Sequence, residues 1–275
     1  MSAPDLRAEA LATWEANASH WDQTMGRDGN KYWQVLQVPS LQRMLGDKLP
    51  GAEALELATG NGLGARWLAA NGAASVLATD GSNKMLQLAE KHISAEGGDV
   101  ISLAKLDVTS DEDFDGLVSA SQPGFDIILM NMAIMDVATL EPLARALPKL
   151  LAKDGVFYAS VLHPVFFTSG ASRNVDLRDN PQTGGLDVTR TKIIKDYLFV
   201  PPAMGVAHLD QPERQIYFHR PIHELFGTFF AAGLVMDAME EPAFTEDDHM
   251  PDRVEAHSNY TQLPALLAFR MRRRT

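Results

Sequence analysis

The sequence predicts an α/β fold in which helices cover both faces of a mostly parallel, doubly wound sheet. Three observations support this prediction. Apolar runs of strand length alternate with runs whose apolar residues have helical spacing, and turn residues separate them. The run FDIILMNM at 125–132 is apolar over most of its length, as expected of a strand covered on both faces. A glycine-rich turn, TGNGLG at 59–64, follows the first such run.

The elements follow one another in this alternating order. We expect strands at 54–58, 75–80, 101–107, 125–132, 155–163, 234–241 and 263–271. We expect helices at 64–70, 83–94, 140–152 and 222–233. A further helical stretch covers 5–46, with breaks expected at Pro39 and Gly46. Right-handed crossovers place the loops after parallel strands along one edge of the sheet, where such sheets bind ligands.

The alternation is interrupted between Pro164 and Pro221. This segment is rich in polar residues, proline and glycine, and it is too long for a simple connection. We therefore interpret it as a lid that recognises the substrate. The chain then divides into an N-terminal helical cover at 1–46, an α/β core at 47–163, the inserted lid at 164–220 and the completion of the core sheet at 221–275.

Composition and charge narrow the classes of function. The chain has 275 residues, of which 45% are hydrophobic, and no cysteine, which excludes disulfides, thiolate metal sites and cysteine nucleophiles. No apolar run reaches the roughly 18 residues that cross a bilayer, and the first residues lack the pattern of a secretion signal. We therefore expect a cytoplasmic protein, monomeric or homodimeric, with no membrane partner.

The sequence also disfavours binding of nucleic acids and of metal ions. The formal net charge is -12, whereas attraction to nucleic acid phosphates normally needs a basic surface. The basic cluster near the C-terminus, Arg270 and 272–274, is typical of a solvated tail. Histidines and carboxylates do not converge on metal-ligand spacings, so no metal is expected.

The glycine turn leaves two kinds of ligand open. A dinucleotide fingerprint has the pattern G-x-G-x-x-G, with an acidic residue about 20 positions further on. Here Gly60 and Gly62 fill the first two positions and Ala65 takes the third. Asp80 follows Gly62 by 18 positions. Because alanine is tolerated at the third position, the glycines alone do not exclude an NAD(P)-binding protein.

Glu56 favours the second kind of ligand. An acidic side chain in the first strand, four residues before Gly60, would repel a pyrophosphate. It suits a ligand with a positively charged ammonium and sulfonium, such as S-adenosylmethionine (SAM). The glycines would then let the backbone approach that ligand closely.

Several segments resemble the class I SAM-dependent methyltransferases, in particular the small-molecule branch that includes quinone and polyketide methylases and type 11 and 12 methyltransferases. The stretch ELATGNG at 56–62 is similar to the motif E/D-x-G-x-G-x-G, with Ala58 in place of its first glycine. DGSNKML at 80–86 resembles D-x-S-x-x-M-L, and Asp107-Val108 matches an acidic-apolar pair. Further matches lie at 125–126, 131–132, 153–155, 217–221 and 240–242, so the resemblance spans 14–270.

The resemblance implies a Rossmann-like sheet of seven strands in the order 3-2-1-4-5-7-6, with strand 7 antiparallel and N-terminal helices over the donor. It implies SAM as methyl donor and S-adenosylhomocysteine (SAH) as product. In this family Asp80 would bind the ribose hydroxyls, and Asp107 with Val108 would bind the adenine amino group. The candidate SAM-binding residues are Glu56, Ala58, Gly60, Gly62, Asp80, Gly81, Met85, Asp107, Val108, Asn131 and Met132, with Trp21 and Tyr32 closing over the ligand.

Methyl transfer mainly requires alignment of the acceptor with the methyl group and exclusion of water. A general base helps only where the acceptor is a neutral hydroxyl or an acidic C–H. The candidate catalytic residues are His163, at the end of a strand, and His219, in YFHRP before a helix. Their alternative roles are a structural hydrogen bond at the turn and anchoring of the lid. Asp136 either faces the acceptor or supplies a negative charge at a helix N-terminus.

The expected function is transfer of a methyl group from SAM to O, N or C of a small-molecule metabolite. The motif N-P-P-Y of amide and base nitrogen methylases does not follow the fourth strand, where NMAIMD stands instead. Three alternatives remain open on the sequence alone. They are an enzyme that binds SAM without methyl transfer, such as a cyclisation catalyst, an NAD(P)-dependent oxidoreductase, and a non-catalytic binding module.

Overall fold

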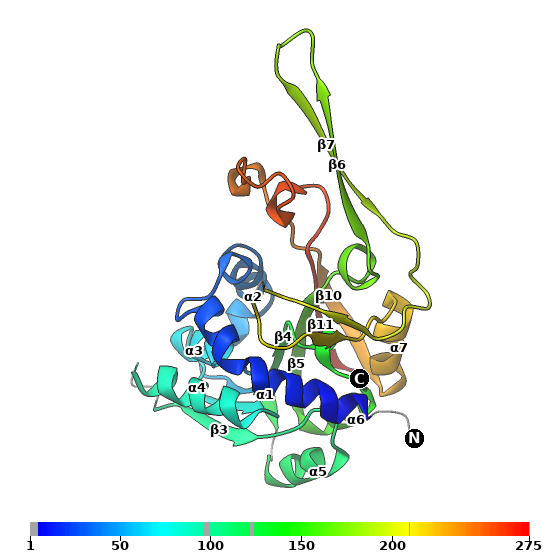
Figure 1. Cartoon of the computed structure of the whole chain (residues 1–275). Coiled ribbons are helices and arrows are strands. Elements are labelled where there is room, and N and C mark those ends of the chain that lie inside the picture. Colours follow the sequence, from blue (N-terminus) through cyan, green and yellow to red (C-terminus); the bar gives the residue numbers. More distant parts are fainter. Residues whose placement is uncertain (1–4, 96–98, 122–123, 209, 275) are drawn as a thin grey trace.

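A seven-stranded sheet with helices on both faces forms the centre of the computed structural model, which describes residues 5–95, 99–121, 124–208 and 210–274 (Figure 1). The strands are β1 (Glu53–Leu57), β2 (Ser75–Asp80), β3 (Ile101–Lys105), β4 (Phe125–Asn131), β5 (Leu151–Leu162), β10 (Leu234–Glu240) and β11 (Leu266–Arg273). Their order is β3-β2-β1-β4-β5-β11-β10, and β11 runs antiparallel to both neighbours. Because β10 and β11 are the sixth and seventh strands of this sheet along the chain, the predicted order is confirmed.

Two apolar layers bury the sheet. The helices are α1 (Leu6–Met25), α2 (Val38–Leu45), α3 (Leu63–Ala70), α4 (Asn83–Ala95), α5 (Asp111–Ala120), α6 (Glu141–Leu150) and α7 (Ile222–Ala231). α2 and α3 pack with Ala54 on one face, and α5, α6 and α7 pack with Leu55 on the other. Successive strand residues point to opposite faces, which is why these two neighbours enter different layers.

The parallel strands bring their carboxyl ends to one edge. In β1, Ala54 lies opposite Val76 of β2 and Ile127 of β4, so the three strands are aligned side by side. The residues that follow β1, β2 and β4 in the sequence therefore meet at this edge. A ligand site built from several of these loops needs no further rearrangement of the chain.

Two features of the helical layer differ from the expectation. The break expected at Pro39 is wrong, because a π-helical turn, η1 (Trp33–Gln37), continues directly into α2. Pro39 lies in the first turn of α2, where a missing N–H leaves no hydrogen bond unmade. The chain breaks earlier, at Gly26, whose φ of 65° ends α1. α5 was not expected, because Phe114 is its one fully buried residue and its apolar periodicity is weak.

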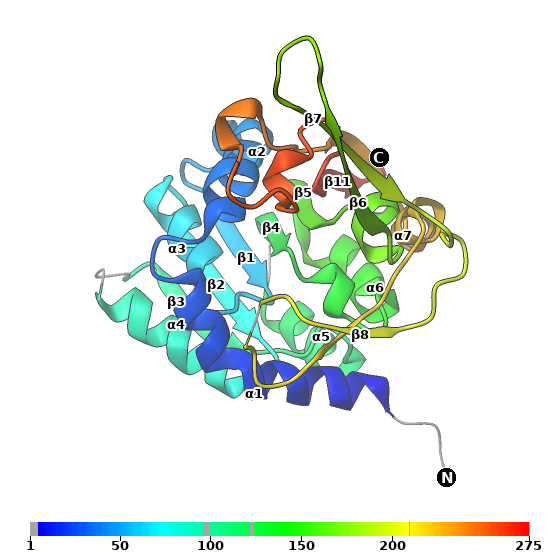
Figure 2. The ribbon, with the colours of Figure 1, turned by 45° about the horizontal axis from the view of Figure 1, so that its top comes forward.

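The helix α1 lies across the ligand edge of the sheet, as Figure 2 shows. Its Asp22 Oδ1 accepts a hydrogen bond of 2.9 Å from Nδ2 of Asn61, within the glycine turn. Its Asn17 exchanges two hydrogen bonds of 2.9 Å with the backbone of Glu213. The N-terminal helix is thus fastened to the sheet on one side and to a distant segment on the other. None of the described helices is both long and apolar enough to cross a membrane.

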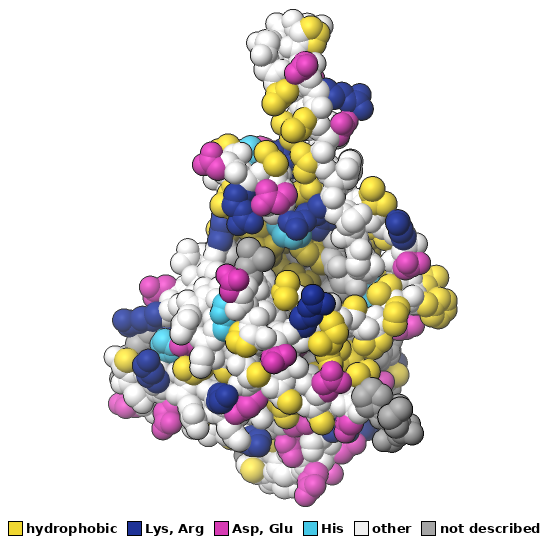
Figure 3. All heavy atoms as spheres, in the orientation of Figure 1, with side chains coloured by type: hydrophobic (Ala, Val, Ile, Leu, Met, Phe, Trp, Pro, Cys, Tyr) yellow, Lys and Arg dark blue, Asp and Glu magenta, His cyan; other side chains and the backbone are white. Residues whose placement is uncertain are grey.

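Residues 164–220 begin with a π-helical turn, η4 (Pro164–Thr168), and a hairpin of β6 (Ser172–Asp179) and β7 (Leu186–Ile193). The hairpin projects from the body of the molecule and exposes hydrophobic and charged side chains together (Figures 1 and 3). The chain then returns over the sheet edge as a strap, residues 203–217 apart from residue 209. In the strap, β8 (Ala203–Gly205) pairs with β9 (Gln215–Tyr217).

Candidate active site

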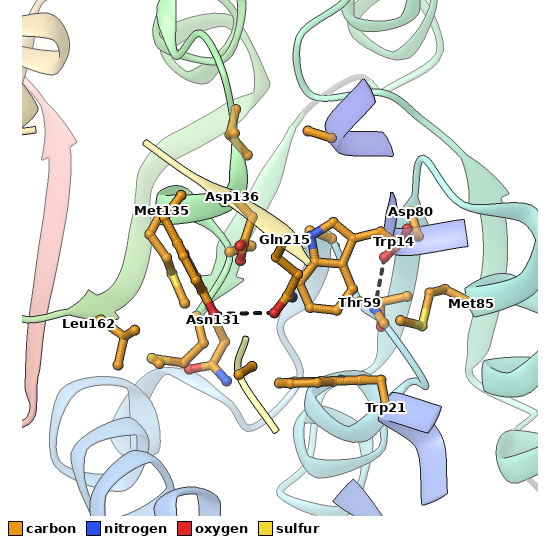
Figure 4. Close-up of a pocket in the computed structure, with 18 of the residues that line it drawn as sticks. Trp14, Trp21, Thr59, Asp80, Met85, Asn131, Met135, Asp136, Leu162 and Gln215 are labelled. Carbon is orange, nitrogen blue, oxygen red and sulfur yellow. Dashed lines mark hydrogen bonds between the residues drawn. The ribbon is translucent and has the colours of Figure 1, made fainter. Parts of the chain in front are cut away.

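A cavity of about 680 Å³ lies at the carboxyl ends of β1, β2 and β4. One side, which we name the glycine-turn side, is lined by Glu56, Ala58, Gly60, Asp80 and Asp107, among others. The other, which we name the lid side, is lined by residues of η3 (Ile134–Asp136), η4, the strap and η6 (His257–Asn259). In Figure 4, Asp80 and Met85 lie on one side, Met135 and Asp136 on the other, and Trp14 between them.

Glu56 lies near the end of β1, buried beneath the start of α3. Thr59 Oγ1 donates a hydrogen bond to Glu56 Oε2, and the backbone N–H of Ala65 also contacts the carboxyl group. Burial raises the pKa of Glu56 to about 8, more than these hydrogen bonds lower it. A Cβ at Gly64 would lie 1.9 Å from Glu56 Oε1, so the glycine makes room for this carboxyl group.

The turn after β1 has an unusual backbone. Ala58 has a φ of 54°, in the left-handed region that favours glycine, which explains why the related motif has glycine there. Gly60 and Gly62 also have positive φ values, of 58° and 80°. Gly60 lines the cavity, whereas Gly62 is not part of its wall. A Cβ at Gly62 would lie 3.2 Å from Ala89 Cβ, so this glycine allows α3 and α4 to approach closely.

Asp80, at the end of β2, is held in one orientation by backbone donors. Its Oδ2 accepts from Gly60 N at 2.9 Å and its Oδ1 from Ser82 N at 2.8 Å. Burial nevertheless raises its pKa to about 6. Gly81 and Met85 line the cavity next to it, on the loop and the first turn of α4.

Asp107 and Val108 line the cavity beyond the end of β3. Asp107 Oδ1 accepts hydrogen bonds from the backbone N–H and the hydroxyl of Thr109, at 2.8 and 2.6 Å. Arg7 Nε of α1 donates to the same Thr109 hydroxyl at 3.0 Å. The first turn of α1 therefore closes the cavity at this end.

Asn131 and Met132 line the middle of the cavity, at the end of β4. Asn131 Nδ2 donates to Gln37 Oε1 and its Oδ1 accepts from Ser160 Oγ, both at 2.7 Å. Met132 has a φ of 56°, a second non-glycine residue in the left-handed region at this edge. Strained backbone of this kind is often stored at functional sites.

Trp21 and Tyr32, which we expect to close over the ligand, both line the cavity. Trp21 packs edge-on against Trp14, with ring centroids 5.2 Å apart, and against His208 of the strap at 5.3 Å. An aromatic cover from α1 thus meets the strap above the cavity.

The structure does not bring His163 or His219 to the cavity wall. His163 Nε2 contacts Glu241 Oε1 at 2.9 Å, and its Nδ1 accepts from Val165 N at 3.2 Å, which caps η4. His219 Nε2 donates to the carbonyl of Tyr197 at 2.6 Å, and its Nδ1 lies 2.9 Å from the Thr168 hydroxyl. Both ring nitrogens of each histidine are therefore engaged in holding the lid segment.

The sequence analysis did not select several lining residues. Trp14 and Gln215 line the cavity but lie outside the stretches that resemble a family motif, and Tyr217 lies in the matching stretch 217–221, where only His219 was a candidate. Asp136, for which the sequence left open a position facing the acceptor or a charge at a helix N-terminus, also lines the cavity. Within the described residues, no three histidine or acidic side chains are grouped to hold a metal ion.

Comparison with known proteins identifies the domain. Residues 55–157 match a family model described as a methyltransferase domain, and no curated protein matches the chain. The fold is similar to that of a SAM-dependent methyltransferase from Mesorhizobium loti, with 24% identity, a TM-score of 0.66, and coverage of 90% of this chain and 100% of that one. It also resembles DhpI in a complex with SAM and HEP (19% identity, TM-score 0.57, 98% and 100% covered). A third similar structure is the CcbJ methyltransferase from Streptomyces caelestis, with 14% identity, a TM-score of 0.57, and coverage of 97% of this chain and 99% of that one.

The sheet itself separates the two nucleotide-binding classes that the glycines left open. A dinucleotide-binding sheet has the strand order 3-2-1-4-5-6, whereas here the antiparallel β11 enters between β5 and β10. The order seen here is the one that the resemblance to class I methyltransferases implied. Residues 55–157 are thus a methyltransferase domain, and the sheet that contains them has the strand order of the class I methyltransferase fold.

Proposed function

We propose that the protein transfers the methyl group of SAM to an oxygen, nitrogen or carbon atom of a small-molecule metabolite. One observation carries the proposal: a single cavity of about 680 Å³ touches both Asp80 on the glycine-turn side and Asp136 on the lid side. Sites for small molecules are concave and lined mostly by apolar groups. A cavity with α1 and the strap over it suits a donor and a small acceptor better than a polymer.

The glycine-turn side would hold the donor. Asp80, oriented by two backbone N–H groups, would accept the ribose hydroxyls. Asp107 and Val108 would meet the adenine, and Glu56 would face the cationic amino-acid end of SAM. Asn131 and Met132 stand between this side and the lid side, where the methyl group has to be presented.

The chain's part in the reaction would be alignment and cover. SAM, when bound, supplies a methyl group that its sulfonium already activates. The aromatic cover formed by Trp14 and Trp21 would keep water from the reacting atoms, and the lid side would align the acceptor. His163 and His219 would act as lid anchors, since neither lines the cavity and both are hydrogen-bonded to residues of or next to the lid segment.

The same geometry supports the division into four segments. Residues 1–46 would form the cover, 47–163 and 221–275 the SAM-binding core, and 164–220 the lid that recognises the substrate. The lid supplies Phe167, Thr168, Gln215 and Tyr217 to the cavity wall. We further propose a monomer or homodimer that acts in the cytoplasm on a small acceptor, with no nucleic acid or membrane partner.

The donor site is tested by isothermal titration with SAM and SAH. Replacing Asp80 by alanine removes the ribose acceptor and leaves two backbone N–H groups unpaired, so we expect affinity to fall about 100-fold, which corresponds to about 3 kcal/mol. The control is Asp115→Ala, at an exposed position of α5, which should bind as the wild type does. Equal SAM affinity in the Asp80 and Asp115 variants would contradict the assignment.

The acceptor class is tested with SAM that carries a deuterated methyl group. The protein is incubated with this donor and a cell extract, and small-molecule, protein and nucleic acid fractions are examined by mass spectrometry. We expect the label in the small-molecule fraction together with SAH. Label in protein or nucleic acid would overturn the small-molecule assignment. Bound SAM without any SAH would favour an enzyme that binds SAM without methyl transfer.

A further inference from the structure

Asp136 is a carboxyl group in the cavity that the donor site does not use. It ends the short turn η3 that follows β4, and its carboxylate points into the cavity toward Gln215 (Figure 4). Its Oδ1 is buried and has no hydrogen-bond partner among the described residues. A buried polar atom without a partner is costly, so it usually indicates a group that is satisfied by a ligand or by water.

The turn that carries Asp136 is held rigidly from the lid segment. Arg220 Nη2 donates to the carbonyl of Val137 at 2.6 Å, and its Nη1 donates to that of Ile134 at 3.2 Å. Phe218 N donates to the carbonyl of Met135 at 2.7 Å. The Arg220 guanidinium group therefore donates its hydrogen bonds to backbone carbonyls on either side of Asp136. It forms no ion pair with the Asp136 carboxyl group.

Among the described residues, no positively charged group offsets the effect of burial on Asp136. Burial alone raises the pKa of Asp136 well above its usual value. Tyr217, the titratable group that senses it, is itself neutral, and its pKa is raised first by burial and then by the charge of Asp136. The Tyr217 hydroxyl donates to Gln215 Oε1 at 3.2 Å. Asp136 is thus a buried carboxyl group whose pKa is raised and whose Oδ1 has no hydrogen-bond partner among the described residues.

We propose that Asp136 binds a basic nitrogen of the acceptor, so that the substrates of this enzyme are small molecules that carry an amine. This inference rests on the proposed function and names the substrate class of the same site. An amine that enters as an ammonium displaces the proton of Asp136 to solvent, and one that enters neutral takes that proton itself. Either way an ammonium stands next to a carboxylate and no other reactant is needed. The pair supplies the missing partner of Oδ1.

The test compares two probes of nearly the same shape on protein saturated with SAH. Phenethylamine and phenethyl alcohol share an aromatic ring that suits the apolar wall near Met135 and Val137, and they differ in the amine. Affinities are measured by titration calorimetry at pH 7 for the wild type, Asp136→Asn and Asp115→Asn. We expect the wild type and Asp115→Asn to bind the amine at least about 10-fold more tightly than the alcohol, and Asp136→Asn to lose this preference.

Asparagine has the shape of a neutral aspartic acid, so Asp136→Asn should fold and should bind SAH as the wild type does. Equal affinities of the two probes for the wild type, including the absence of binding by both, would overturn the proposal. An amine preference that persists in Asp136→Asn would also overturn it. Failure of the wild type to bind SAH would instead contradict the proposed function, so the two failures are distinguishable.

Discussion

On the glycine-turn side of the cavity, Glu56, Asp80 and Asp107 all lie within two residues of the end of a parallel strand, and backbone donors orient the last two. On the lid side, Asp136 and Tyr217 come from segments 80 residues apart, brought together by Arg220. The first side is thus a property of the sheet edge, which related folds share. The second depends on individual long-range contacts. This difference predicts that changes on the two sides separate donor binding from acceptor binding.

The largest expected effect concerns the buried acid on the glycine-turn side. The folded pKa of Glu56 is about 8, above the value of 4.5 for an unperturbed glutamate, so the folded state keeps a proton that the unfolded state has lost. Stability is therefore greatest below pH 4.5 with respect to this group and falls as the pH rises to about 8. Over this window the loss is on the order of 4 kcal/mol, since each pKa unit corresponds to about 1.4 kcal/mol.

The check is urea unfolding of the wild type and Glu56→Gln between pH 5 and pH 8. Glutamine stays neutral throughout, so we expect the variant to gain stability relative to the wild type as the pH rises. The matched control site is the exposed Glu53, at the start of the same strand. The unfolding free energy of Glu53→Gln should differ from that of the wild type by a small amount that is nearly constant with pH. A constant difference for Glu56→Gln as well would contradict the buried neutral acid.

The space beneath the glycine turn is tested by Gly64→Ala. The added Cβ would lie 1.9 Å from Glu56 Oε1 and 3.3 Å from Leu129 Cδ2, so the packing has to shift. We expect a loss of about 3 kcal/mol in the free energy of unfolding, at the upper end for overpacked sites. Gly116→Ala, in α5 with nothing within 4 Å, should stabilise by about 0.5 kcal/mol. Similar changes in the free energy of unfolding for both variants would show that the Glu56 side chain can move aside.

The lid side is tested by Arg220→Met, which leaves the carbonyls of Ile134 and Val137 without their donor. We expect a loss of about 2 kcal/mol in unfolding free energy and a weaker amine preference, while SAH affinity stays within about threefold. Arg145→Met removes an exposed pair with Asp111 and should change stability by less than about 0.5 kcal/mol. A large loss of SAH affinity in Arg220→Met would mean that the two sides are not separable.

The smallest expected effect concerns the backbone of the glycine turn. Replacing Ala58, at a φ of 54°, by glycine relieves a left-handed conformation and should stabilise the fold by about 1 kcal/mol. Ala16→Gly, at an exposed position within α1, should destabilise by about 1 kcal/mol instead. Thermal unfolding of the two variants would show shifts of opposite sign, and a lower melting temperature for Ala58→Gly would argue against strain at this turn.

Much of the fold was predictable because its signals are local. The strand predicted at 75–80 is β2 without a change of bounds, and the run at 125–132 is β4 to within one residue. Pro39 was misjudged because a proline ends a helix from the interior but is tolerated in a first turn, and the sequence does not show which turn it occupies. The hairpin at 172–193 has alternating runs around a TGG turn, a signal that the sequence analysis overlooked.

The sequence by itself determined the sheet, the glycine turn and the acidic residues at the strand ends, because each depends on patterns within a few residues along the chain. Only the tertiary structure shows that Gly62 packs against α4 and that His163 and His219 do not line the cavity. It also leaves Asp136 Oδ1 without a hydrogen-bond partner among the described residues, since its environment is made by residues about 80 positions away. Burial and pairing of a polar group depend on what folds around it, and no local pattern contains that information.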